Sequence, residues 1–74
     1  MFTEIIAKIL LIDESDITDD LKRVDLESWD SMTHLILISD LEQEFNVTFS
    51  DDEIASIESI QNIKDILKKH NVAI

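Results

Sequence analysis

Ser31 and His34 are the two side chains of this sequence whose types and spacing suggest chemistry. They stand three residues apart, so one turn of helix would bring a hydroxyl and an imidazole together, as in nucleophilic catalysis. The 74-residue chain, however, contains no glycine for a nucleophile elbow, shows no evident oxyanion hole and leaves little room for a cleft. We therefore predict that the protein is not an enzyme and that His34 lies where the helices meet a loop.

Ser31 also has a position at which an attached anion would be stabilised. It begins a predicted helix over residues 31–45, where unpaired backbone N–H groups and the positive end of the helix dipole favour a phosphate. The alternative is that Asp30 or Ser31 is only the N-cap of this helix, a position that both residue types often occupy. Taken alone, these residues leave both interpretations open.

Cysteine is absent, which excludes disulfides, thiolate metal sites and a thiol nucleophile supplied by the chain. Any thiol chemistry must therefore come from an attached group. The acidic segment that starts at Asp13 lacks the glycine and the twelfth-position glutamate of an EF-hand, so we predict no dedicated metal site. Weak binding of divalent ions by its clustered carboxylates stays open.

Four segments have helical spacing and none has a convincing strand pattern, so we predict an all-α fold in a single domain, residues 1–74. The first helix would bury a stripe made of Phe2, Ile5, Ile6, Ile9 and Leu10. Ser50 and Glu53 form a capping box that opens a short third helix, with Ile54 and Ile57 facing inward. Ser59 can cap a last helix, whose buried stripe would be Ile60, Ile63, Ile66 and Leu67.

A long acidic loop, Asp13–Asp30, connects the first two helices. Its eight acidic and two basic residues are interspersed with apolar ones, which predicts an ordered loop, and ordered loops of this length are often functional. Because the chain has neither glycine nor proline, other residues must end its helices. We expect Asn46 to take the left-handed conformation after the second helix, Asn71 to stop the last helix and His70 to be solvated.

The helix over residues 31–45 has two faces. At about 100° per residue, one wide arc is apolar and should pack against the other helices; it contains Leu35, Leu37, Ile38, Leu41 and Phe45. Met32 and Ile36 lie on the opposite side, which is otherwise polar and acidic. Two apolar side chains in such surroundings indicate a partner-docking patch, although isolated exposed apolar residues are also common.

Charge restricts the partners that the protein can have. Its 17 acidic residues outnumber its 6 lysines and arginines, for a formal net charge of -11, and no basic residue occurs from Val24 to Ile63. Nucleic acids and anionic membranes both require positive charge on the protein, so we expect neither as a partner and expect proteins with basic surfaces instead. The sequence shows no signal peptide and no membrane span, so we expect a cytoplasmic protein. We also expect a monomer.

These features together resemble the acyl carrier protein family. The resemblance rests on Asp30-Ser31-Met32 opening a long helix that ends in residues 41–45, Leu-Glu-Gln-Glu-Phe, which is similar to the family's Asp-Ser-Leu followed by an acidic Leu-Glu-x-x-Phe ending. The match continues over residues 26–68 through the spacing to Phe49, the acidic start of the third helix and the last apolar stripe. It implies a four-helix bundle of three major helices and one short third helix.

The resemblance also implies a prosthetic group and the residues that serve it. A separate phosphopantetheinyl transferase would move 4'-phosphopantetheine from coenzyme A onto the Ser31 hydroxyl, and Asp30 would take part in helix capping and transferase recognition. Cargo would be held as a thioester on the arm and passed among acyl-loading and acyl-using enzymes with basic docking surfaces. The positions that correspond to the family's partner contacts are Met32, Leu35, Ile36 and Glu42. Positions that correspond to its cargo pocket, or that only pack in the core, are Leu37, Ile38, Leu41, Phe45, Phe49, Ile57 and Ile60.

Several positions depart from the pattern typical of fatty-acid synthesis. Ile36 stands where an acid is common, Ser39 where a larger apolar residue is common, and Trp29 precedes the Asp-Ser pair. The segment Ser-Trp-Asp-Ser is similar to free-standing carriers of specialised pathways, so the cargo is either a growing fatty acid or a hydroxyacyl, aminoacyl or polyketide unit. A protein of another class, an acidic helical adaptor or inhibitor without a prosthetic group, would use Met32 and Ile36 as its anchors.

Overall fold

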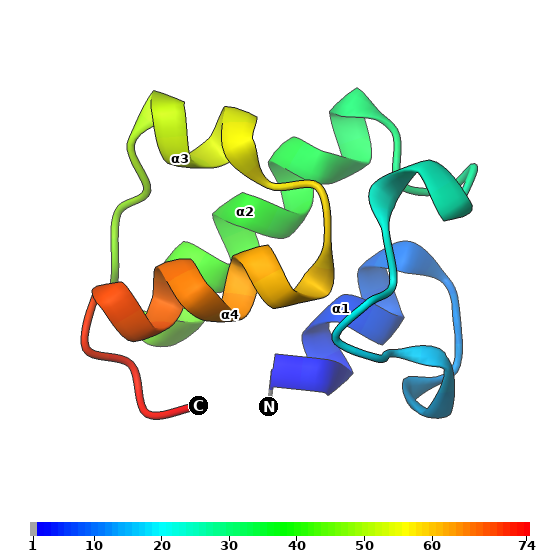
Figure 1. The fold of residues 1–74 in the computed structure, drawn as a ribbon, viewed down its shortest axis with the longest axis horizontal. Helices are drawn as coiled ribbons and strands as arrows, with labels where there is room; N and C mark the ends of the chain where they lie inside the picture. Colours follow the sequence, from blue (N-terminus) through cyan, green and yellow to red (C-terminus); the bar gives the residue numbers. More distant parts are fainter. Residues whose placement is uncertain (1) are drawn as a thin grey trace.

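The computed structural model of the protein describes residues 2–74 and confirms the predicted all-α fold. Its helices are α1 (Phe2–Leu10), α2 (Ser31–Phe45), α3 (Asp51–Ser56) and α4 (Ile60–Lys69), with two short 3-10 turns, η1 (Glu14–Asp16) and η2 (Arg23–Asp25), between α1 and α2. Figure 1 shows α2 running diagonally behind α4, with α3 above α4 and α1 at the lower right. Three longer helices and a short third helix therefore form the bundle.

One apolar core lies between the helices and receives side chains from α1, α2, α4 and the loops. Residues spaced three or four apart share a helix face, so each of the longer helices directs one stripe inward. Leu37 and Leu41 of α2 and Ile6 of α1 all belong to this core, and all three are completely shielded from solvent. The buried apolar residues are Phe2, Ile6, Leu10, Trp29, Leu37, Ile38, Leu41, Phe49, Ile57, Ile60, Ile63 and Leu67.

The predicted stripes of the first and last helices are confirmed. In α1, Phe2, Ile6 and Leu10 are buried at a spacing of four residues, and Ile5 and Ile9 are half-buried at the edge of the core. The four stripe positions of α4 behave in the same way, because three are buried and Ile66 is half-buried. Ile57 is also buried but lies just after the end of α3.

Polar caps fix the starts of α3 and α4, as the sequence predicts. The Ser50 hydroxyl accepts a hydrogen bond from the backbone N–H of Glu53 at 3.1 Å, and the Glu53 carboxylate accepts one from the Ser50 N–H at 2.9 Å. The Ser59 hydroxyl accepts from the N–H of Asn62 at 3.2 Å. Because the first N–H groups of a helix have no partner within it, each cap contributes about 1 kcal/mol to helix stability.

Asparagine takes the place of glycine where helices end. Asn46 follows α2 in the left-handed conformation, with φ 54° and ψ 50°, and Asn71 has φ 67° after α4. The left-handed conformation was predicted for Asn46, whereas Asn71 was predicted only to stop the last helix. Asparagine is one of the few residues that visits this region readily. Leu11 also has a positive φ, 59°, at the end of α1, which the sequence did not predict. A branched leucine in this conformation is uncommon.

His70 is only partly solvated, with 28% of its side chain exposed, whereas the sequence predicted a solvated residue. Its ring stacks on Phe49 with the centroids 6.0 Å apart, and its Nε2 lies 3.1 Å from the Glu53 carboxylate. The hydrogen bond from the Ser50 N–H and the contact with His70 lower the pKa of Glu53 to about 2. Glu53 therefore joins the start of α3 to the end of α4, a contact between distant segments that local sequence patterns do not reveal.

The loop between α1 and α2 is attached to the connection between α3 and α4 by backbone hydrogen bonds. The N–H of Arg23 donates to the Glu58 carbonyl at 2.8 Å, and the N–H of Ile60 donates to the Leu21 carbonyl at 3.0 Å, around one isolated antiparallel bridge. The Ser28 hydroxyl donates to the carbonyl at the end of α1 at 2.7 Å. The loop is thus ordered, as predicted, and it places Arg23 near the start of α2.

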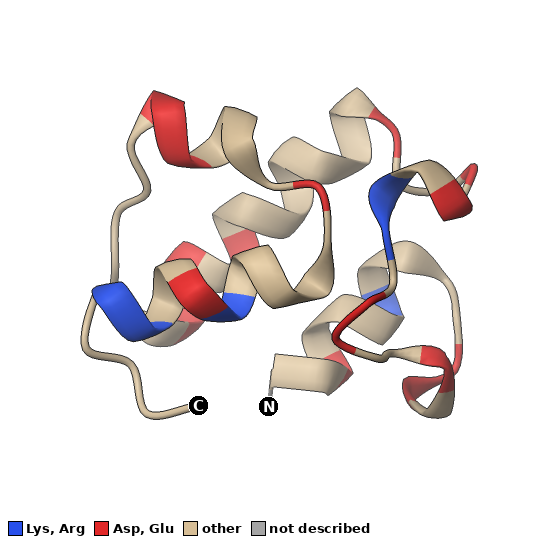
Figure 2. Cartoon of the chain, viewed as in Figure 1, with Lys and Arg blue, Asp and Glu red and all other residues tan. Residues whose placement is uncertain are grey.

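Charged residues are distributed unevenly over this fold. Figure 2 shows acidic residues along the loop after α1, on α2 and at the start of α3, whereas basic residues are concentrated on α4 and near η2. Among residues 2–74, no helix is long and apolar enough to cross a membrane.

Candidate functional site

Ser31 is the first residue of α2, and its hydroxyl does not cap the helix. That role belongs to Asp30, whose carboxylate accepts a hydrogen bond from the N–H of Thr33 at 2.8 Å. Ser31 is exposed, and its Oγ accepts a hydrogen bond from Nη2 of Arg23 at 3.4 Å. Of the two roles that the sequence left open for this pair, capping applies to Asp30, and the Ser31 hydroxyl remains accessible to a modifying enzyme.

Capping also keeps Asp30 ionised. Hydrogen bonds from the backbone and the hydroxyl of Thr33 hold the pKa of this carboxyl below its usual range, and the N–H of Met32 and the charge of Arg23 act in the same direction. A negative charge therefore stands one residue before Ser31 at physiological pH. Any phosphate attached to Ser31 would share the positive helix terminus with this carboxylate.

Arg23 reaches the start of α2 from η2. Its Nε donates to the carbonyl of Trp29 at 3.2 Å, while its Nη2 contacts the Ser31 hydroxyl. Sequence reasoning missed this residue, because its position depends on the pairing of the loop with residues 58–60. One signal was available: Arg23 is the only arginine of the chain and the last basic residue before 40 residues without any.

Trp29 and His34 form a buried polar link from the start of α2 to α3. The Trp29 Nε1–H donates to Nδ1 of His34 at 2.9 Å, and His34 Nε2 lies 3.0 Å from the carbonyl of Ile54. Because Nδ1 accepts, the proton of the neutral ring must be on Nε2, which donates to Ile54. His34 is only 4% exposed, so it lies deeper than the boundary position that we predicted.

A shallow pocket of about 300 Å³ opens beside the Ser31 hydroxyl, between α2 and α3. Its wall combines the Arg23 guanidinium with apolar side chains and one carboxylate. It is lined by Arg23, Ser31, His34, Leu35, Asp51, Ile54 and Ala55. A group attached to Ser31 therefore meets a cation at its first atoms and apolar surface farther away.

Three of the four predicted docking residues form an exposed apolar strip on α2. The exposed fractions are 74% for Met32, 59% for Leu35 and 49% for Ile36. The exposure of Leu35 corrects our assignment of that residue to the buried arc. His34 takes the inward position in this turn, because the Trp29 and Ile54 hydrogen bonds satisfy both ring nitrogens there.

Glu42, the fourth predicted docking residue, has a structural contact. It is half-buried, and its Oε2 accepts a hydrogen bond from the backbone N–H of Phe49 at 2.7 Å. This bond fixes the connection from α2 to α3. Its free carboxylate surface is consequently smaller than that of an ordinary exposed glutamate.

The residues predicted for a cargo pocket lie in or against the core. Phe45 is half-buried and the other six are buried, and none of the seven lines the pocket at Ser31 or the groove between α1 and α2. The six buried positions are Leu37, Ile38, Leu41, Phe49, Ile57 and Ile60. In this state of the protein they pack against one another, and their use as a cargo shelter stays a prediction.

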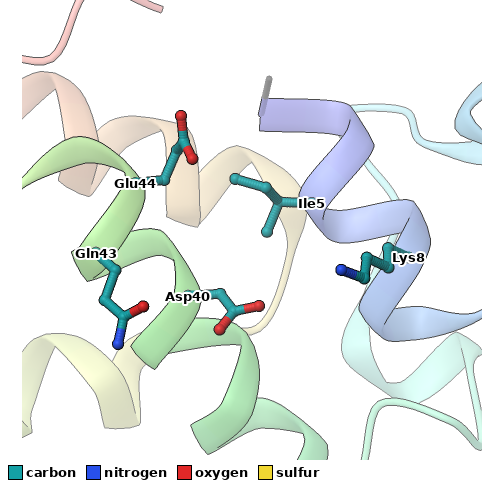
Figure 3. Close-up of a pocket in the computed structure, with 5 residues that line it drawn as sticks. All are labelled: Ile5, Lys8, Asp40, Gln43 and Glu44. Atoms are coloured by element: carbon teal, nitrogen blue, oxygen red, sulfur yellow. The ribbon is translucent and has the colours of Figure 1, made fainter.

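A second, larger groove of about 440 Å³ lies between α1 and the C-terminal half of α2. Figure 3 shows Lys8 extending toward Asp40, with Ile5, Gln43 and Glu44 on the remaining sides. The groove has no hydroxyl or other residue suited to covalent attachment of a phosphate. Its charged lining is also unsuited to an apolar cargo, so the smaller pocket at Ser31 is the better candidate.

Comparisons with known proteins identify the family of this chain. The family described as "Phosphopantetheine attachment site" matches residues 2–67. The acyl carrier protein of Buchnera aphidicola subsp. Baizongia pistaciae is 37% identical over 67 residues, which cover 90% of this chain and 86% of that protein. The acyl carrier protein of Petrotoga mobilis is 33% identical over 66 residues, covering 89% and 78% of the two chains.

Solved structures give the same result. A Mycobacterium tuberculosis structure assigned as an acyl carrier protein has a TM-score of 0.84 and 26% sequence identity, and the match covers 93% of this chain and 92% of that one. The predicted bundle and the predicted family are thereby confirmed together.

The residues around Ser31 fit a phosphopantetheine group. The hydroxyl is exposed and free of capping, a guanidinium lies within hydrogen-bond distance of it, and apolar pocket wall lies beyond. These features suit a phosphodiester that continues into a slender flexible arm. The chain therefore belongs to the acyl carrier protein family, with covalently attached 4'-phosphopantetheine as its prosthetic group.

Proposed function

We propose that Ser31 is the attachment residue and that the protein carries an acyl group from one enzyme to another on the arm attached there. The observation that carries this proposal is the exposed Ser31 hydroxyl at the start of α2, which Asp30 frees from capping and Arg23 contacts. Attachment joins Ser31 Oγ to the phosphorus that bears the pantetheine half of coenzyme A. The bond from that phosphorus to the adenosine bisphosphate half breaks, and the hydroxyl proton passes to the transferase.

The chain positions the arm and does not catalyse a reaction. When bound, the arm provides a terminal thiol that holds an acyl group as a thioester, which the cysteine-free chain cannot do by itself. His34 is not available as a base for Ser31, because Trp29 and Ile54 occupy both of its ring nitrogens. The protein therefore acts as a carrier without an activity of its own.

Met32, Leu35 and Ile36 form the surface that partner enzymes contact. Apolar side chains exposed by about half or more on an acidic helix favour a partner with a small apolar hollow and a basic rim. Long-range attraction from the net charge of -11 speeds such encounters while leaving the affinity moderate. Glu42 contributes at the edge of this surface, and its bond to the Phe49 N–H limits its reach.

The cargo would be sheltered in a cavity that opens when the core side chains of α2 move apart from those near α3 and α4. Ile57 and Phe49 lie outside regular helix, in the segments that flank α3, so they are able to shift without breaking a helix. The carrier works in the cytoplasm as a monomer, where coenzyme A and the transferase are at hand.

Modification by a transferase of broad specificity tests this proposal. Wild-type protein, Ser31→Ala and Ser39→Ala are each co-expressed with the transferase, and their intact masses are measured. Ser39 is a matched control because it is an exposed serine of the same helix. We expect wild type and Ser39→Ala to gain one phosphopantetheine and Ser31→Ala to gain none. An acidic adaptor without a prosthetic group would gain none in any form, and gain by Ser31→Ala would assign the attachment to another residue.

A further inference from the structure

The fold does not depend on the contact of Arg23 with the exposed Ser31 hydroxyl, because Arg23 has other partners. Its Nε already has a partner in the Trp29 carbonyl, and its backbone N–H is satisfied by Glu58. The Nη2 contact to Ser31, at 3.4 Å, is long and links two groups that water would satisfy equally well. A guanidinium is thus held in place with part of its donor capacity unused beside the reactive oxygen.

We propose that Arg23 is the positioning residue for the prosthetic group, a counter-ion that binds the phosphodiester once it is attached to Ser31. This inference rests on the proposed attachment at Ser31. The phosphodiester forms on the oxygen that Nη2 already contacts, so its charged oxygens come within reach of the guanidinium fork. Arginine suits this role because its planar donors match phosphate and stay protonated at all physiological pH values.

The surrounding charges make such a counter-ion necessary. Asp30 precedes Ser31, and Asp51 lines the same pocket, so a new phosphodiester would stand among carboxylates in a chain of net charge -11. The N-terminus of α2 offers limited compensation, because the Asp30 carboxylate already occupies the N–H of Thr33. Arg23 is the one basic residue among those that line the pocket.

The guanidinium is also preorganised, which distinguishes it from a flexible surface lysine. The Arg23 backbone is anchored to the α3–α4 connection through Glu58, and its Nε is anchored through Trp29, whose indole is itself held by His34. Little side-chain freedom remains to be lost when the phosphate binds. Arg23 would fix where the arm leaves the protein surface.

A thermodynamic cycle between modification and substitution tests the proposal. The melting temperatures of the apo and holo forms are measured for wild type, Arg23→Gln, Arg23→Lys and Lys22→Gln. Lys22 is the matched control, because it carries the same charge one residue away and is exposed. Comparing holo with apo within each variant removes any effect of the substitution on the apo fold.

For each protein, the melting temperature of the apo form is subtracted from that of the holo form. At low salt we expect this difference to be about 2–4 °C lower in Arg23→Gln than in wild type. Arg23→Lys should lie between them, and Lys22→Gln should match wild type. The ³¹P resonance of the phosphodiester should also shift in Arg23→Gln and not in Lys22→Gln.

Identical holo-minus-apo differences and identical ³¹P shifts in wild type and Arg23→Gln would overturn the role of Arg23. Should the glutamine variant fail to fold or to be loaded, the same comparison is made with Arg23→Met, which also removes the charge, and a difference identical to that of wild type is equally decisive. Intact mass separates this outcome from failure of the proposed function. Absence of the phosphopantetheine mass from wild type refutes attachment, whereas a loaded protein with no coupling refutes only Arg23.

Discussion

Substitution of Trp29 by phenylalanine tests whether the buried link from α2 to α3 holds the site together. The change removes the indole N–H and leaves Nδ1 of His34 as a buried acceptor without a partner, in surroundings where Trp29 is 2% exposed and His34 is 4% exposed. An unsatisfied buried group costs about 1–3 kcal/mol, and the smaller ring adds roughly 1 kcal/mol through lost packing. We therefore expect a loss of about 2–4 kcal/mol.

This loss is large for a chain of this size. A single small core seldom supplies more than about 3–5 kcal/mol of net stability, so Trp29→Phe should be close to unfolding. In urea titrations followed by circular dichroism, with a slope of about 1 kcal/mol per molar urea, the midpoint should fall by roughly 2 M or more. Val24→Ala is the control; Val24 is 89% exposed and its change should stay within about 0.5 kcal/mol.

A double-mutant cycle identifies the contact responsible. Combining Trp29→Phe with His34→Gln should give a coupling free energy of about 0.5–3 kcal/mol, because each substitution removes the same hydrogen bond. ¹⁵N spectra of the wild-type imidazole should show the proton on Nε2. The reasoning fails if the midpoint of Trp29→Phe moves by less than about 0.5 M urea or if the two substitutions are additive.

Three further predictions follow from contacts elsewhere in the fold. Because the pKa of Glu53 is lowered from 4.5 to about 2, its contribution to stability is complete above pH 4.5 and is lost as the pH falls toward 2. Urea titrations should therefore show a difference between wild type and Glu53→Gln at pH 6 that narrows by pH 3. Met32→Glu and Ile36→Glu should weaken loading by partner enzymes without changing the circular dichroism spectrum, and loss of helicity would instead place these residues in the core. Asn46→Ala should lower stability by about 1 kcal/mol in thermal melts while Asn46→Gly should not, because alanine resists a φ of 54°; equal effects would exclude strain as the cause.

Local patterns were sufficient to predict the helices and their caps. The boundaries of α2, the capping box of Ser50 and Glu53, and the left-handed Asn46 each depend on residues within a few positions of one another. Hydrophobic periodicity likewise indicates which face of α1 and α4 is buried. These features are set by the backbone geometry of a helix, which the sequence specifies directly.

Contacts between distant segments were beyond such reasoning. Leu35 and His34 are neighbours on α2, and periodicity assigns the leucine to the core because it is apolar. The structure buries His34 instead, because Trp29 and Ile54 offer partners for both of its nitrogens. His70 was misjudged for the same reason, since its partners Phe49 and Glu53 lie about twenty residues away. Polar side chains are placed by partners that only the folded chain brings together.

The geometry of α2 places the proposed attachment residue and the proposed docking residues on one helix. Met32, Leu35 and Ile36 follow Ser31 by one to five residues, and at 1.5 Å per residue the strip ends roughly 7.5 Å along the axis from the attachment point. A partner that seats on this strip therefore brings its own active site to a fixed distance from the base of the arm. The link from Trp29 through His34 to Ile54 keeps α3 against the same end of α2. Loosening that link would make the position of the arm less well defined even where the docking strip is intact. In the fraction of Trp29→Phe that stays folded, partner turnover should therefore decrease more than partner binding does.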